Sequence, residues 1–254
     1  MSSASDSTEI AARLARVRAR VAAAEDAAGR PRDSVRLLLA TKTQPLEVVR
    51  IALEADAAAR AAVPAGDAPR AVLVGENRVQ ELVAKAPHLH DLTSDFHLIG
   101  PLQSNKVNQA LGAATCIESV DSVDLARRLA TRCVSAGRVL DVLVQVNVSG
   151  EVTKHGLDPA HAVEAALEVA ALDGLRLRGF MTVGARSPEM DVVRAGYSTL
   201  RGIRDRVLAS GAAGTGAAGE LSMGMSGDLE AAVAEDATIV RVGTGVFGAR
   251  PPVA

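Results

Sequence analysis

A lysine stands where an apolar run ends, at the close of the segment Val35–Lys42 (VRLLLATK). The leucines at 37–39 predict a buried strand, and a lysine at the C-terminal end of such a strand can lie in a partly dehydrated pocket. There its amine loses affinity for a proton and becomes a nucleophile toward carbonyl groups. Lys42 is therefore a candidate for covalent chemistry; the alternative is a surface lysine that begins a loop.

Two glycine-rich stretches near the C-terminus could bind an anion, Leu221–Asp228 (LSMGMSGD) and Arg241–Arg250 (RVGTGVFGAR). Ser226 and Thr244 can supply hydroxyl donors, and the glycines let backbone amides approach a phosphate closely. Most glycine-rich turns serve only as turns. Two of them combined with Lys42 nevertheless describe a ligand with a carbonyl group and a phosphate, and pyridoxal 5'-phosphate (PLP) is such a molecule.

Two further polar residues lie at the ends of predicted strands. Arg241 is either a salt-bridged scaffold residue or a donor to the pyridine nitrogen of the cofactor. An arginine there keeps that nitrogen unprotonated, which makes the ring a poorer electron sink than a carboxylate partner would. Asn77, in the stretch Gly75–Glu81 (GENRVQE), could cap the next helix with Gln80, could point its amide at a ligand, or could do both.

The elements that must position these residues alternate along the chain. Short apolar strands alternate with alanine-rich helices, and this pattern predicts a parallel sheet with right-handed crossovers. Eight strands in 254 residues favour a closed (β/α)₈ TIM barrel, one domain over residues 1–254. The predicted strands are Val35–Thr41, Ala71–Gly75, Asp95–Ile99, Thr115–Ser119, Leu140–Asn147, Arg176–Thr182, Glu220–Met223 and Thr238–Val242. The predicted helices between them are Leu46–Ala58, Arg78–Lys85, Asn105–Leu111, Ser122–Ala136, Pro159–Ala171, Met190–Ser210 and Gly227–Glu235.

An extra helix is expected within residues 1–30, packed on the barrel. Asp6 can cap its N-terminus, and apolar residues recur after it at helical spacing. Two stretches rich in alanine, glycine and proline, at 57–69 and 211–219, read as mobile surface insertions without chemistry.

Bulk composition excludes several classes of protein. The formal net charge is −2, with 48% apolar, 23% charged and only 2% aromatic residues, so nucleic acid is not expected as a partner. Cys116 and Cys133 have neither metal-ligand nor paired spacing, and the five histidines form no metal site. Neither a signal peptide nor a membrane-spanning run is evident, so we expect a cytoplasmic protein.

Seven ordered stretches resemble the pyridoxal phosphate homeostasis proteins, also called the YggS or PROSC family, over nearly the whole chain. They are ATKTQP, GENRVQE, HLIGPLQSNK, QVNVSGEVTKHGL, LRGFMTVG, LSMGMSGDLEAA and VRVGTGVFGAR. The resemblance implies a monomeric barrel like the N-terminal domain of alanine racemase, with PLP joined to Lys42 as a Schiff base. The resemblance further implies the residues that bind the cofactor: Ser226, Gly243 and Thr244 at the phosphate, Arg241 at the pyridine nitrogen, and Ser222 and Asn77 lining the pocket.

Binding is expected rather than turnover. A PLP-dependent racemase needs a second acid–base group, which in alanine racemases is a tyrosine presented with help from an additional β-rich domain. We see no such domain here, and Tyr197 falls within a predicted helix, where packing is its expected role. The expected function is a carrier or regulator of PLP and related B6 vitamers that passes PLP to apo-enzymes. The alternatives are an amino-acid racemase, a class I aldolase-like enzyme, and a scaffold that binds no small molecule.

Overall fold

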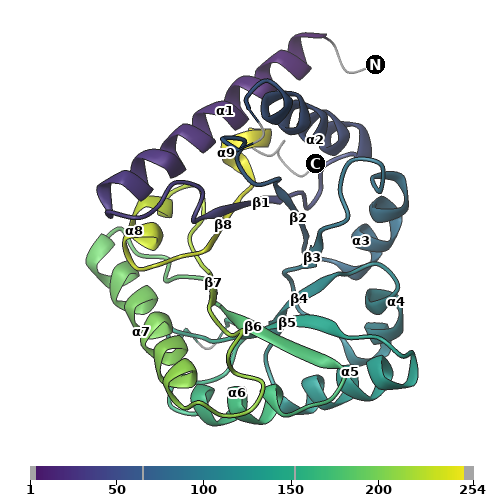
Figure 1. Ribbon diagram of the computed structural model, residues 1–254, viewed down its shortest axis with the longest axis vertical. Helices are drawn as coiled ribbons and strands as arrows, with labels where there is room; N and C mark the ends of the chain where they lie inside the picture. The colour runs from purple at the N-terminus through teal and green to yellow at the C-terminus, as the bar shows by residue number, and fades with distance from the viewer. Residues whose placement is uncertain (1–3, 65, 152, 249–254) are drawn as a thin grey trace.

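The computed structural model describes residues 4–64, 66–151 and 153–248. Val152 and the pair Ala249-Arg250, which belong to two of the motifs above, lie outside this range. Eight parallel strands close into a barrel in sequence order, and β1 pairs with β8 to complete the ring (Figure 1). The strands are β1 (Arg36–Ala40), β2 (Leu73–Glu76), β3 (Phe96–Leu98), β4 (Cys116–Val120), β5 (Leu140–Gln145), β6 (Leu175–Met181), β7 (Glu220–Ser222) and β8 (Ile239–Val242).

Helices surround the barrel on its outside (Figure 1). The larger ones are α1 (Ala4–Ala27), α2 (Leu46–Ala61), α3 (Val79–Lys85), α4 (Val107–Leu111), α5 (Val123–Ser135), α6 (Ala162–Ala170), α7 (Met190–Ala209) and α8 (Leu229–Ala234). A short helix, α9 (Thr244–Phe247), and two 3₁₀ turns, Ala86–His88 and Ser104–Lys106, were not predicted. The predicted (β/α)₈ barrel is confirmed, as is each of its strands.

Two local predictions were wrong, and a third needs a refinement. Asp6 lies within helix α1, which already includes Ala4, so it does not occupy the N-cap position. Residues 57–61 continue α2, because their alanines favour helix. The stretch 211–219 lies mostly at the surface, as predicted, but it is anchored to the fold because Thr215 and Ala218 are buried. At Gly214, where φ is +79°, an added Cβ would lie 2.2 Å from a carbonyl oxygen of α6.

The alternation of side chains along β1 explains where Lys42 points. Leu38 joins Leu73 and Ile239 inside the barrel, whereas Leu37 and Leu39 pack outward against the helices. Each fully buried leucine contributes roughly 1.5–3 kcal/mol. Because successive side chains in a strand face opposite sides, the inward face beyond Leu38 continues to Ala40 and Lys42.

Helix α1 supports the part of the barrel formed by the end of the chain. Its buried stripe of Ile10, Leu14, Val17 and Val21 has helical spacing, and the helix lies along α2, α8 and α9 (Figure 1). Arg20 reaches from α1 to the loop after β7, where its Nη1 donates to the Ser226 carbonyl oxygen at 3.1 Å. The N-terminal helix therefore fixes one of the two glycine-rich stretches.

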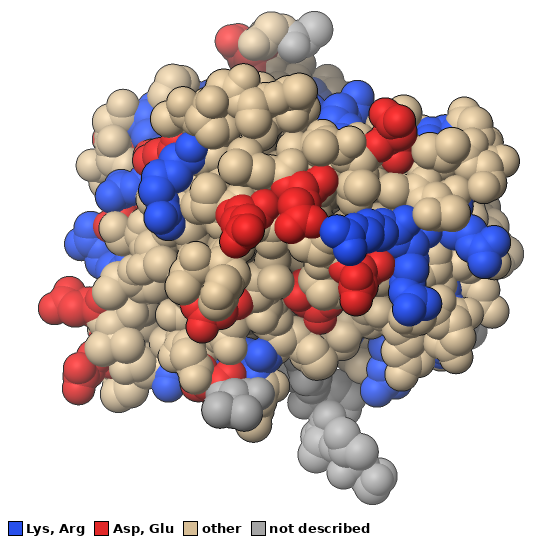
Figure 2. Space-filling view, turned by 90° about the horizontal axis from the view of Figure 1, so that it is seen from below, with Lys and Arg blue, Asp and Glu red and all other residues tan. Residues whose placement is uncertain are grey.

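Charges of both signs are interspersed on the face shown in Figure 2, in keeping with a net charge close to zero. Within the described ranges, no helix has the length and apolar character needed to cross a bilayer. The same ranges contain no cluster of three or more metal-binding side chains.

Candidate functional site: a lysine and an anion cradle at the barrel mouth

A cavity of about 450 Å³ opens at the C-terminal ends of the strands. Lys42 lines it from the end of β1, Asn77 from the end of β2, and Arg241 from β8. The two glycine-rich stretches provide the wall formed by Ser226, Gly243 and Thr244. Residues far apart in the sequence thus meet in one cavity, at the end of the barrel where ligands bind in this architecture.

Ser226 is the centre of a small cluster of hydrogen-bond donors. The Thr244 hydroxyl and the Gly245 amide each donate to Ser226 Oγ at 3.3 Å. A Cβ added to Gly245 would lie 3.3 Å from that oxygen and 2.9 Å from Val242, so a larger residue would fill the cradle. Hydroxyl and amide donors of this kind suit a phosphate.

Arg241 is buried, and its guanidinium is held in a fixed position. Nη1 donates to the backbone oxygen of Ser222 at 2.6 Å and to its hydroxyl oxygen at 2.8 Å, while Nη2 donates to the Thr182 carbonyl at 2.6 Å. Two backbone carbonyls therefore orient the guanidinium group of Arg241, and this residue still borders the cavity.

A buried carboxylate balances the charge of Arg241. Ser222 Oγ donates to Glu118 Oε2 at 2.5 Å, and His97 Nδ1 donates to Glu118 Oε1 at 2.6 Å. Burial alone would raise the pKa of Glu118, but His97 and Arg241 outweigh it and hold that pKa below its ordinary value. Burial also lowers the pKa of Arg241.

The loop that carries Ser226 is held from beneath by Asp228. Its Oδ1 accepts the Met225 amide at 2.5 Å, and its Oδ2 accepts the Tyr197 hydroxyl at 2.8 Å. Tyr197 is fully buried in α7, and burial together with the adjacent carboxylate raises its pKa. It does not line the cavity, so its role is to fix the loop.

The predicted site residues separate into two groups. Lys42, Asn77, Ser226, Arg241, Gly243 and Thr244 line the cavity. Ser222 does not, because it is fully buried one layer deeper, between Arg241 and Glu118. The prediction that Asn77 caps the next helix was wrong, since Arg78 occupies the N-cap position of α3 and makes no capping hydrogen bond with its side chain.

Sequence reasoning missed several lining residues. Gln44, Ile99, Val183, Arg186 and Met225 also border the cavity. Each lies on a strand end or the loop after it, so position in the barrel was the available signal. The residue types gave no indication of a ligand site, since two of these residues are aliphatic.

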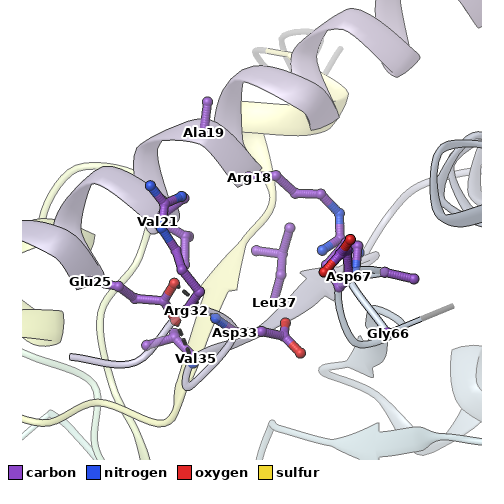
Figure 3. Close-up of a pocket in the computed structure, with 13 residues that line it drawn as sticks. Arg18, Ala19, Val21, Glu25, Arg32, Asp33, Val35, Leu37, Gly66 and Asp67 are labelled. Carbon is purple, nitrogen blue, oxygen red and sulfur yellow. Dashed lines mark hydrogen bonds between the residues drawn. The ribbon is translucent and has the colours of Figure 1, made fainter. Parts of the chain in front are cut away.

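A larger cavity, of about 740 Å³, lies at the opposite end of β1 between α1 and the loop before β2 (Figure 3). Arg18, Glu25, Arg32 and Asp33 line it. Arg18 pairs with Asp56 and Arg32 with Asp26. Glu25 accepts hydrogen bonds from the backbone amides of Asp33 and Val35, so its charge is used within the fold.

Comparison with known proteins connects the mouth cavity to a family. A sequence profile described as "Alanine racemase, N-terminal domain" matches residues 12–251. A pyridoxal phosphate homeostasis protein of Pseudomonas aeruginosa is 39% identical over 241 residues, which make up 95% of this chain and 96% of that one. One from Aquifex aeolicus is 37% identical over 238 residues, 94% of this chain and 97% of that one. The chain belongs to the pyridoxal phosphate homeostasis protein family.

Solved structures agree with this membership. PipY of Synechococcus elongatus, solved with PLP bound, is 34% identical, with a TM-score of 0.75 over 94% of this chain and 100% of that one. An unknown protein from Bifidobacterium adolescentis is 44% identical, with a TM-score of 0.89 over 97% and 98% of the two chains. Alanine racemase from Clostridium difficile is 15% identical, with a TM-score of 0.67, and shares the fold alone. The match covers 98% of this chain and 57% of the racemase.

The cavity residues fit the cofactor that this family's name specifies. A primary amine, a fixed guanidinium and a cradle of hydroxyl and amide donors border the same space. The cavity volume lies within the usual range for small-ligand sites, roughly 300–1,000 Å³. Glycine at 245 keeps the cradle open, as shown by the contacts an added Cβ would make there.

Proposed function

We propose that this protein serves PLP homeostasis by holding PLP as a Schiff base on Lys42, as a carrier and not as an enzyme. The observation that carries the proposal is the convergence of Lys42, Arg241 and the Ser226–Thr244 cradle on one cavity. Family membership and the PLP-bound PipY structure support it.

The roles of the residues follow from their chemistry. Lys42 would hold PLP through its amine, because PLP would supply an aldehyde with which a primary amine condenses reversibly. Ser226, Thr244 and the backbone at Gly243 would hold the phosphate. Arg241 would donate a hydrogen bond to the pyridine nitrogen, and because an arginine keeps its own proton, that nitrogen would stay unprotonated and withdraw electrons weakly.

Borohydride reduction of the PLP-treated protein, followed by peptide mass mapping, tests this proposal. The phosphopyridoxyl group is expected on Lys42. A reduced adduct confined to another lysine would overturn the site assignment. A protein that stays colourless and unchanged by added PLP would favour the aldolase-like alternative.

A racemase function is opposed by the position of Tyr197. Its hydroxyl is buried and donates to Asp228, so it is not presented to the cavity as a second acid–base group. Racemisation assays with several amino acids check this point. Turnover of roughly 1 per second or faster, in the normal enzyme range, would defeat the carrier proposal.

The proposed function includes the delivery of PLP. The protein, as a monomer in the cytoplasm, would pass PLP to apo-enzymes and would accept other B6 vitamers. Mixing the PLP-loaded protein with an apo-aminotransferase, with and without a trap for free PLP, distinguishes direct transfer from release into solution. Analytical ultracentrifugation tests the monomer.

A further inference from the structure

The residue before Lys42 is anchored from outside the barrel wall. Thr41 is fully buried, and its hydroxyl donates to Glu76 Oε1 at 2.6 Å. Its carbonyl oxygen accepts a hydrogen bond from Lys85 Nζ at 2.9 Å. Both Glu76, at the end of β2, and Lys85, at the end of α3, are buried. Thr41, which leads into Lys42, is therefore held at its side-chain hydroxyl by Glu76 and at its backbone carbonyl by Lys85.

The residue after Lys42 is anchored from the same side. The Thr43 amide donates to Glu81 Oε2 at 2.9 Å. Thr43 has a φ of +63°, in the left-handed region that a β-branched residue adopts only when its surroundings impose it. Glu81 is thus the contact that satisfies the amide of a strained turn directly beyond Lys42.

One ammonium group joins the two anchors. Lys85 Nζ lies 2.6 Å from Glu76 Oε1 and 3.4 Å from Glu81 Oε2. Burial alone would raise the pKa of Glu81, but the Thr43 amide and Lys85 outweigh it and hold that pKa below its ordinary value. Glu81 therefore stays charged at neutral pH and keeps its bond to Thr43.

We propose that Glu81 and Lys85, with Glu76, are positioning residues for Lys42. They fix the peptide units on both sides of it, so that its amine points into the mouth cavity. This inference rests on the proposed function, because it gives the clamp a purpose in Schiff-base formation. The three residues themselves act from behind the strand, since none of them lines the cavity that Lys42 borders.

Substitutions at Glu81 test the clamp with little risk to the fold, because its side chain is 23% exposed. Glu81→Ala removes the acceptor for Thr43, and we expect PLP binding to weaken roughly tenfold, equivalent to about 1.4 kcal/mol. Glu81→Gln keeps an oxygen acceptor and should bind within a few-fold of wild type. Adding Thr43→Gly to Glu81→Ala should restore most of the loss, because glycine adopts positive φ without steric cost.

The matched control is Glu220→Ala. Glu220 is also 23% exposed and also ion-paired, with Arg178, but it lies at the start of β7, at the far end of the barrel. We expect this variant to bind PLP like wild type, with a comparable change in melting temperature. Equal losses of PLP binding in the two alanine variants, or unchanged binding in Glu81→Ala, would overturn the inference.

A second measurement is independent of PLP. The acetylation rate of Lys42 in cofactor-free protein is compared, by peptide mass spectrometry, with that of Lys154, which is held by Glu151 and the Gly184 carbonyl. The ratio of the Lys42 acetylation rate to that of Lys154 should rise in Glu81→Ala. It should return to the wild-type value in the variant that also carries Thr43→Gly. A constant ratio contradicts the clamp. If the ratio changes in Glu81→Ala but borohydride traps no PLP on the wild-type protein, the clamp is supported and the proposed function is rejected.

Discussion

The two ends of strand β1 use the same device for different purposes. Before the strand, the Glu25 carboxylate accepts the amide of Asp33, and after it the Glu81 carboxylate accepts the amide of Thr43. Both amides belong to residues with positive φ, +60° and +63°. Aspartate tolerates that conformation better than a β-branched threonine does, so the strain is concentrated at the mouth.

The cavities at the two ends differ in what their polar groups are doing. The N-terminal cavity, shown in Figure 3, is the larger of the two, about 740 Å³ against 450 Å³. Its Arg18 and Arg32 are each paired with an aspartate, Asp56 and Asp26. The mouth cavity has an amine, hydroxyls and a fixed guanidinium on its wall. Volume therefore does not identify the site, whereas the chemistry of the lining groups does.

The largest expected difference between the two ends concerns Lys42. Lys42→Ala should abolish the adduct trapped by borohydride and leave the fold intact, because the side chain is only half-buried. Arg32→Ala, in the other cavity, should leave the adduct at the wild-type level. Absorbance spectra with PLP and the melting temperature measure both; a wild-type spectrum in Lys42→Ala would contradict the assignment.

Arg241→Leu is expected to damage both stability and binding. It removes the charge of Arg241 and leaves the buried Glu118 with His97 as its remaining partner, and breaking such a buried charge pair costs about 3–5 kcal/mol. Arg18→Leu deprives Asp56 of a partner at the other end, but Asp56 retains the Val72 amide, so we expect about 1–3 kcal/mol. Urea unfolding measures both, and only Arg241→Leu should weaken PLP binding.

Acidification should destabilise the mouth through Glu118 and Glu81. Both have pKa values below the ordinary value of about 4.3, so their contribution is complete above that pH and is lost as pH falls further. Glu76, whose pKa burial raises, acts in the opposite sense. Glu118→Gln should therefore flatten the dependence of the unfolding free energy on pH below about 4; an unchanged slope would refute this assignment.

The smallest expected effect concerns the anion cradle. Ser226→Ala removes one hydroxyl, and we expect PLP to bind roughly tenfold more weakly, as for loss of a hydrogen bond to a charged group. Pyridoxal, which lacks the phosphate, should bind as it does to wild type. Ser34→Ala, which removes a hydroxyl that donates to Glu25 at the other end, is the control. If Ser226→Ala weakened the binding of pyridoxal as much as that of PLP, Ser226 would not act through the phosphate.

Most of the architecture could be predicted from the sequence, because it depends on local patterns. Alternating apolar strands and amphipathic helices determined the barrel, and the position of Lys42 followed from the leucines before it. The buried layer beneath the cavity could not be predicted. Glu118 and Ser222 lie on separate strands, and only barrel closure brings them together at 2.5 Å.

The clamp around Lys42 was equally hidden, for a different reason. Glu81 and Lys85 are spaced four apart on α3, a pattern that is common on exposed helical faces. Whether such a pair is solvated or faces a strand depends on how the helix packs. The positive φ at Thr43 also has no sequence signal, since threonine is not a residue that favours it.

Closure of the ring by β1 and β8 has a consequence for biosynthesis. Lys42 emerges from the ribosome early, whereas Gly243 and Thr244 emerge near the end of synthesis, and Arg20 can brace Ser226 only once both are present. Under the proposed function, a growing chain therefore has the reactive amine but not yet the residues that bind the phosphate. Capture of the vitamin would follow translation, and a truncated product released early would be unable to sequester it.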